Sequence, residues 1–351
     1  MIYHSQKTVW QNLSFVTKKL QNHAPKEVKL MLETVRISAM QVSMLFVLIA
    51  VGVVLRRTHV FEGKGITCVT DILFYIISPC IIIDRLVGTV SDNGEAAFEI
   101  LGWSALATCV AFVILIGLTA LIFKGRTSSS IKAVRYSCIF ANLGFMGIPL
   151  VEGILGKAAT AYVGVAVAIF TMLNFIVGIA LFTEKRKSFT AIFLNPGTIA
   201  IVIALVLIFL PFDPMKNEAA SIVMQPISWL ASAQTPLSMM LCGAILGGVK
   251  LKGWYKDKYL WLTVVLRLVV FSALTTAALL ALPMILPIPT DIVTAIAITF
   301  ACPAAVAGAM FSEKFGGNTE LLTKSIALTT FLSIFTIPIV CAVCRAVYPV
   351  M

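Results

Sequence analysis

The sequence predicts an all-α integral membrane protein with ten transmembrane helices, arranged as two inverted five-helix repeats in which helices 4 and 9 are broken and cross. Three features predict this fold: the composition, a series of long apolar runs, and an internal repeat of proline-containing segments. Of the 351 residues, 59% are hydrophobic and 12% are charged, and the mean hydropathy is +0.98. Soluble domains carry about a quarter charged residues, so the solvent around this chain is lipid.

Apolar runs long enough to cross a bilayer, about 20 residues each, recur along the chain. Backbone groups in lipid must be paired within the span, and these runs lack the alternation of barrel strands. Each run is therefore predicted to be helical. The expected spans are residues 36–55, 65–88, 98–123, 131–154, 158–183, 196–212, 219–249, 258–283, 290–312 and 320–347.

Basic residues are concentrated in alternate loops. The loops after spans 1, 3, 5 and 7 contain Arg56, Arg57, Lys64, Lys124, Arg126, Lys132, Arg135, Lys185, Arg186, Lys187, Lys250, Lys252, Lys256 and Lys258. The positive-inside rule places these loops in the cytoplasm and both termini outside. The net charge of +11 thus reflects membrane orientation, and no nucleic-acid partner is expected.

The N-terminal segment departs from this charge pattern. Residues 1–35 carry five lysines on the side predicted to be outside and lack the apolar region of a signal peptide. We therefore expect translation to begin at Met31. The remaining chain divides into a first five-helix repeat at 36–183, a short cytoplasmic linker at 184–195 and a second, inverted repeat at 196–351.

Two pairs of prolines indicate the internal repeat. "FYIISPCIIIDRLVG" in span 2 resembles "LASAQTPLSMMLCGAILGG" in span 7, and Pro79 matches Pro236. The interval from Pro79 to Pro149 nearly equals that from Pro236 to Pro303. Because each half contains five spans, an odd number, the second half must lie upside down relative to the first.

The stretch "ANLGFMGIPLVEGILG" predicts a broken helix 4. Proline removes a backbone hydrogen bond and clashes with the carbonyl four residues earlier, so we expect a break near Pro149, with this residue opening a second half-helix. Gly144 and Gly147 favour the break, and Asn142 is expected either to brace it or to contact a ligand.

The matching stretch "TFACPAAVAG" predicts a broken helix 9 at Pro303. The small residues Cys302 and Ala304 would let the two broken helices approach closely. Opposed half-helix N-termini at mid-membrane favour an anion, and a carboxylate is the natural ligand.

Further polar residues lie at a similar depth and are candidates for supporting contacts: Ser78, Asn174, Gln234, Thr235, Thr330 and Ser333. Many serine and threonine hydroxyls bond to their own helix instead. The amides of Asn174 and Gln234 satisfy themselves less easily and are the stronger candidates.

Three ionisable residues within spans are candidates for charge recognition or coupling. Arg267 either reaches the cytoplasmic headgroups or contributes to the site. Glu152 either turns away from the site, which we favour, or couples a proton to the solute. Asp71 is expected near the cytoplasmic face, paired with Arg267 or with a loop base.

Several functional classes lack the residues that they need. No histidine lies in a span, so no histidine-based metal site is expected in the membrane, and the eight cysteines form no readable disulfide framework. Clustered acids for acid–base catalysis and a nucleotide-binding loop are also missing from the sequence. We therefore expect no enzyme, no ATP-driven pump and no cofactor beyond a coupling H⁺ or Na⁺.

Taken together, residues 31–348 resemble the auxin efflux carrier family of bacterial permeases, which is related to the plant PIN carriers. The segments that carry the resemblance are "LFVLIAVGVVLRR", "YIISPCIIIDRL", "NLGFMGIP", "NPGTIA", "ISWLASAQTPLSMMLCGAIL", "CPAAVAGAMFSEKFGGNTELL" and "TTFLSIFTIP". The resemblance implies a scaffold of helices 1, 2, 6 and 7, a moving transport domain, helices crossing at Pro149 and Pro303, and often a homodimer. It also implies organic-anion substrates such as malate or malonate, and a bacterial cytoplasmic (inner) membrane location. Glu152 departs from the family pattern.

The leading hypothesis is a secondary active transporter (permease) that moves a small mono- or dicarboxylate across the lipid bilayer by alternating access. One alternative is a cation/proton antiporter of similar crossed-helix architecture, which would need carboxylates at the crossing. Another is a membrane anion sensor that does not transport, and such a protein would normally carry a soluble output domain.

Overall fold

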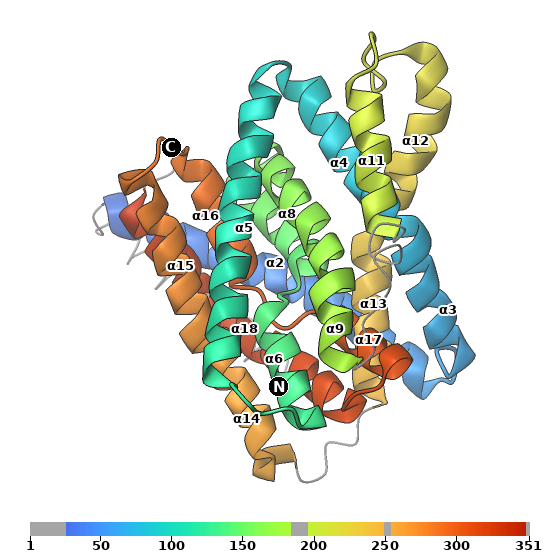
Figure 1. Ribbon diagram of the computed structural model, residues 1–351, viewed down its shortest axis with the longest axis vertical. Helices are drawn as coiled ribbons and strands as arrows, with labels where there is room; N and C mark the ends of the chain where they lie inside the picture. Colours follow the sequence, from blue (N-terminus) through green and yellow to red (C-terminus); the bar gives the residue numbers. More distant parts are fainter. Residues whose placement is uncertain (1–25, 184–195, 249–253, 349–351) are drawn as a thin grey trace, which may run out of the picture.

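The computed structural model describes residues 26–183, 196–248 and 254–348, and within these ranges the chain is helical without any strand. The helices form an elongated bundle, in which α5 and α15 run side by side along one edge and α11 and α12 stand at the other (Figure 1). The predicted linker at 184–195 and the residues before Lys26 lie outside the described part of the chain.

The first half of the chain contains α2 (Lys26–Arg57), α3 (Lys64–Ile72), η1 (Leu73–Ile77), α4 (Ser78–Asn93), α5 (Ala96–Ile122), α6 (Ser129–Ile139), η2 (Leu143–Gly147), α7 (Ile148–Leu155), η3 (Lys157–Ala159), α8 (Thr160–Leu173), η4 (Asn174–Gly178) and α9 (Ile179–Phe182). The second half contains α11 (Pro196–Ile208), α12 (Glu218–Ser232), α13 (Gln234–Gly247), η5 (Trp254–Lys256), α14 (Lys258–Val265), η6 (Leu266–Phe271), α15 (Ser272–Ala281), η7 (Leu282–Met284), α16 (Thr290–Phe300), α17 (Ala307–Phe315) and α18 (Thr319–Val347).

Each expected span coincides with one of these helices or with consecutive ones. In the described residues, six continuous helical stretches are long and apolar enough to cross a membrane: Lys64–Asn93, Ala96–Ile122, Lys157–Phe182, Glu218–Gly247, Lys258–Met284 and Thr319–Val347. Helix α2 starts ten residues before the predicted start of the first span.

Four wide, π-helical turns interrupt the long helices at 73–77, 143–147, 174–178 and 266–271. Two of them end just before Pro79 and Pro149, which lie in the first turns of α4 and α7. A wider turn before a proline makes room for its ring against the preceding carbonyl. The other two contain Asn174 and Arg267, so all four lie at or next to predicted site residues.

Helix α2 packs most closely against α13, and its neighbour on another side is α18. The α2–α13 approach is possible because Gly52 faces the backbone of Met240 and Gly243 faces the backbone of Ile49. Small residues at such a contact let two helices meet backbone to backbone, which favours association in lipid.

Asp84 and Arg85 of α4 are both largely shielded from solvent. Their side chains are 15% and 24% exposed. Ser228 of α12 donates a hydrogen bond to Asp84 at 2.5 Å, and Arg85 donates to Thr160 of α8 at 3.4 Å. The two charges hold α4 against its neighbours, because a partly buried charge needs partners.

The close approach of α2 and α13 leads to a stability prediction. A β-carbon at Gly243 would collide with the carbonyl of Ile49, so Gly243→Ala should destabilise the protein by about 1–3 kcal/mol, the usual cost of overpacking. Gly102 of α5 has open space around it, and Gly102→Ala is the matched control. Thermal unfolding in detergent should show a lower midpoint for the first variant alone; equal midpoints would contradict the packing.

Candidate functional site

The two broken helices meet at their breaks. Residues 140–142, between α6 and η2, pair antiparallel with residues 303–305, between α16 and α17. Asn142 donates its backbone N–H to the carbonyl of Pro303 at 2.8 Å, and Ala305 donates to the carbonyl of Phe140 at 2.9 Å. Each break thus supplies hydrogen bonds that the other has lost, as lipid requires.

The two broken elements are alike up to the crossing. Helix α6 and helix α16 each have 11 residues and run into the crossing. After the crossing, the first half continues through the 5 residues of η2 and the 8 residues of α7, whereas α17 has 9 residues. The two broken elements therefore match in length before the crossing and differ after it.

The break in helix 4 lies at 140–142, before the predicted position at Pro149. Pro149 does open α7, as expected, but the π-helical turn η2 separates it from the bridge at Ala141. The chain becomes extended at Phe140 because its neighbours pair with the other break, and Pro149 only shapes the helix that follows. In helix 9, by contrast, Pro303 itself belongs to the bridged segment.

Both half-helices that leave the crossing present unpaired backbone N–H groups. Among the described residues, no acceptor is found for the N–H groups of Gly144 and Phe145, or of Val306 and Ala307. Neither α7 nor α17 has an acidic residue in its first turn. Such N-termini carry a partial positive charge and suit an anion.

Two buried amides lie beside the first of these N-termini. Asn142 is 3% exposed and its side-chain Nδ2 has no partner in the described residues; Gln234 is 2% exposed and its Oε1 has none. Gln234 reaches over Gly144, where a β-carbon would lie 2.9 Å from its Nε2. Because unpaired polar atoms are costly in a buried site, these amides point to a polar ligand or water.

On the opposite side, α16 packs against the turn η2. A β-carbon on Gly147 would lie 2.6 Å from the methyl group of Thr299, so the glycine allows the close contact. Cys302 and Ala304 are completely buried within the crossing, as their small size predicted.

Arg267 is buried at the crossing and does not reach a headgroup region. Its guanidinium donates to the carbonyls of Cys302, Phe300 and Cys138, so it touches both broken helices. The expected pairing with Asp71 is not found. Snorkelling is therefore excluded for this residue.

The hydroxyl-bearing candidates Ser78, Thr235, Thr330 and Ser333 differ in hydrogen bonding and burial. Ser333 bonds the carbonyl of Thr330 in its own helix, and Thr330 keeps an unpaired hydroxyl in the described residues. Ser78 and Thr235 are half-buried at the starts of α4 and α13. Thr329, which the predicted site does not include, accepts a hydrogen bond from the N–H of Ala304 at 3.2 Å and so braces the crossing.

Tyr136 is a second residue that the sequence-based site lacks. It is fully buried in α6, lies against Gly178 and Gly308, and donates its hydroxyl to Oδ1 of Asn174 at 2.7 Å. Asn174 therefore serves as a structural partner through Oδ1, while its Nδ2 stays unpaired in the described residues. A tyrosine next to a break and two distant glycines that fit its ring are visible only once the helices are packed.

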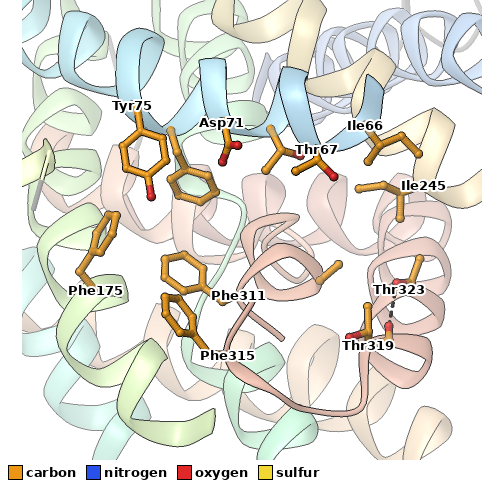
Figure 2. A pocket seen from close by; sticks show the side chains of 13 residues that line it. Ile66, Thr67, Asp71, Tyr75, Phe175, Ile245, Phe311, Phe315, Thr319 and Thr323 are labelled. Atoms are coloured by element: carbon orange, nitrogen blue, oxygen red, sulfur yellow. Dashed lines mark hydrogen bonds between the residues drawn. The ribbon is translucent and has the colours of Figure 1, made fainter. Parts of the chain in front are cut away.

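A cavity of about 320 Å³ lies between the α3–η1 segment and the α17–α18 segment. Apolar and hydroxyl side chains line it around one carboxylate: Ile66, Thr67, Thr70, Asp71, Phe74, Tyr75, Phe175, Ile245, Ala309, Phe311, Phe315, Thr319 and Thr323. Figure 2 shows Asp71 and Tyr75 on one wall, facing Phe311 on the other.

An apolar cluster includes residues of both the crossing and the α3–η1 segment. It contains Ala304 and Val306 of the crossing together with Leu73 of η1 and Leu241 of α13. On the cavity side, the rings of Phe74, Phe175 and Phe311 stand edge to face, with centroids 5.3–6.2 Å apart.

Glu152 and Asp71 both lie away from the crossing. Glu152 is exposed on α7, which agrees with the favoured interpretation that it turns away. Asp71 is exposed at the cavity, and no ion pair of the described residues includes it. No carboxylate is found among the described residues that form the crossing.

Two comparisons with known proteins bear on the chain. A family model described as membrane transport protein matches residues 37–193 and also residues 185–341. No curated protein matches the chain.

The brace from Thr329 is open to test. Thr329→Val keeps the shape of the side chain but leaves the buried N–H of Ala304 without an acceptor, which should cost about 1–3 kcal/mol. Thr276→Val, which removes a buried hydroxyl that has no partner in the described residues, is the matched control. Thermal unfolding in detergent should distinguish the variants, and an unchanged midpoint for Thr329→Val would show that the brace does not contribute.

Proposed function

The chain belongs to the membrane transport protein family, as its resemblance to the auxin efflux carriers indicated, and from this premise we propose that it is a secondary transporter for a small organic anion. The substrate is a mono- or dicarboxylate that binds at the crossing of the two broken helices. Transport is a process of alternating access and uses no enzymatic step.

The electrostatics of the crossing are the observation that carries this proposal. Two half-helix N-termini with unpaired N–H groups lie at the bridged breaks, and the unpaired amides of Asn142 and Gln234 lie beside one of them. A carboxylate can accept from these N–H groups and from Nδ2 of Asn142 at once, whereas the unpaired Oε1 of Gln234 is an acceptor. Hydrogen bonds to a charged group are stronger than those between neutral groups. A cation would gain nothing from these donors.

We further propose ten spans in two inverted repeats. The equal lengths of α6 and α16 support this arrangement, as does the separate match of the family model to each half of the chain. The scaffold would then comprise α2, α3–α4, α11 and α12–α13, and the remaining helices would form the transport domain.

The cavity and the Arg85 contact support an inward-facing state. With the orientation that the loop charges predict, the cavity at Asp71 opens toward the cytoplasm, since it is lined by the first turns of α3 and α18. On the opposite side, Arg85 of α4 covers Gly164 of α8, where a β-carbon would lie 2.6 Å from the arginine side chain. A closed outer contact with an open inner cavity is what alternating access requires in this state.

We also propose a location, an oligomeric state and a coupling group for the transporter. The protein resides in the bacterial cytoplasmic (inner) membrane with both termini outside, and it forms a homodimer. Proton or sodium coupling is assigned to a carboxylate outside the crossing, for which Asp71 at the cavity is the candidate.

Two other functions are less well supported. A cation/proton antiporter needs ionisable carboxylates at the crossing, and the described residues there include none. A membrane sensor binds the anion without moving it, and the cavity next to the crossing would then have no transport role.

Uptake into proteoliposomes tests the proposal directly. Labelled malate, malonate, lactate, succinate and indole-3-acetate are supplied with and without an inward proton gradient. Saturable uptake of one acid, competed by the unlabelled acid, is expected. If no acid moves into vesicles of folded protein and a pH probe reports sodium-driven proton exchange, the antiporter replaces the anion carrier.

Removing either amide should weaken transport of the acid that moves. Asn142→Ala deletes the donor Nδ2 and Gln234→Ala deletes the donor Nε2, which lies over Gly144. A hydrogen bond to the carboxylate is worth about 1.5–3 kcal/mol, so KM should rise by about tenfold or more in each variant. Ser104→Ala, which removes a buried hydroxyl without a partner in the described residues, should leave KM unchanged. Wild-type KM values in both amide variants would remove them from the site.

A further inference from the structure

Arg267 lies at the one place where both broken helices end. It belongs to the π-helical turn η6 and is 1% exposed. Its Nε donates to the carbonyl of Cys302 at 3.1 Å, and its Nη1 donates to Cys138 at 3.0 Å. Its Nη2 donates to Phe300 at 2.5 Å and again to Cys302 at 2.8 Å. No ion pair of the described residues includes it.

The three carbonyls are those that the breaks leave without a helical partner. Cys138 is in the last turn of α6, and Phe300 is the last residue of α16. The N–H groups that would continue these helices are used elsewhere, since Asn142 bonds to Pro303 and Ala304 bonds to Thr329. Orphan carbonyls at a helix end carry a partial negative charge and cannot be solvated in lipid.

Counting donors shows what Arg267 has left for a ligand. A guanidinium has five N–H donors, and four of them are used by the carbonyls. The remaining one belongs to Nη1. A residue bound in this way is poorly suited to hold a carboxylate through the usual two parallel hydrogen bonds.

Counting charge gives a second consequence. Each helix end carries roughly half an elementary charge, so the two C-terminal ends together carry about one negative charge, which a single guanidinium balances. The two N-terminal ends at Gly144 and Val306 have no acidic partner in their first turns. The field at the crossing is therefore positive on balance.

We propose that Arg267 is a positioning residue that ties the C-terminal ends of α6 and α16 together and, by cancelling their negative charge, gives the crossing its preference for anions. This inference rests on the proposed anion transport and assigns to Arg267 neither a headgroup contact nor the role of the substrate's main counter-ion. Without the guanidinium, the negative and positive helix ends would oppose each other at the site.

Two substitutions separate charge from geometry. Arg267→Lys keeps the charge but loses the planar fork that reaches three carbonyls, so it should lower the maximal uptake rate and leave the preference for anions intact. Arg267→Gln removes the charge and should also raise KM for the transported acid by about tenfold or more, because an uncompensated buried helix end opposes the anion. Val269→Ala, on the exposed side of the same turn, is the control.

The decisive readout is competition by the acid and by its uncharged primary amide. In the wild type and in Arg267→Lys, the acid should compete much better than the amide, and in Arg267→Gln this preference should shrink. An unchanged preference in Arg267→Gln would leave only a structural tie and overturn the role in selectivity. Equal loss of preference in both variants would indicate direct recognition of the substrate and also overturn the proposal.

Hydrogen–deuterium exchange keeps the inference testable if no acid is transported, in which case the proposed function fails separately. In detergent, Arg267→Gln should speed exchange at the bridging amides of Asn142 and Ala305, while Val269→Ala should not. Unchanged protection of these amides in a folded Arg267→Gln variant would overturn the positioning role itself.

Discussion

The antiparallel bridge between Ala141 and Ala304 is the contact on which the rest of the structure depends. A helix that breaks inside a membrane leaves N–H and C=O groups that lipid cannot satisfy. Here each break supplies partners to the other through Asn142 and Ala305, so neither half could keep its broken helix alone. The crossing is thus a feature of the two halves together, which explains why both must be present in one fold.

The backbone groups that the bridge leaves without a partner are of two kinds: carbonyl groups at helix C-terminal ends, which carry partial negative charge, and N–H groups at helix N-terminal ends, which carry partial positive charge. The carbonyl ends are gathered on Arg267, whereas the N–H ends at Gly144 and Val306 stay open. The proposed role of Arg267 is therefore to change the charge balance of the site, because cancelling the negative ends of the helices leaves their positive ends dominant. The unpaired amides of Asn142 and Gln234 add directional donors and acceptors to this diffuse field.

The proposed transport requires that the site open alternately to the two sides of the membrane while the crossing itself stays assembled. The bridge, the Thr329 brace and the packing of Tyr136 hold the crossing within one group of helices. The contacts of Leu73 and Phe74 in the α3–η1 segment are of another kind, apolar and aromatic. Apolar surfaces can separate and pack again because the hydrophobic effect does not depend on direction. Breaking a buried hydrogen bond instead leaves a donor and an acceptor unpaired, which costs free energy.

The sequence by itself determined the membrane class, the positions of the long apolar helices and the two segments that break, since these follow from local hydrophobicity and from proline and glycine chemistry. The family resemblance followed from motifs such as "NLGFMGIP" and "CPAAVAGAMFSEKFGGNTELL". The tertiary structure decided where helix 4 breaks, at Phe140 instead of Pro149, and what Arg267 binds. It also revealed Tyr136 and Thr329, whose partners lie far away in the chain. A break is fixed by the partner that satisfies its backbone, and a buried charge by the groups that surround it; neither is a property of the local sequence.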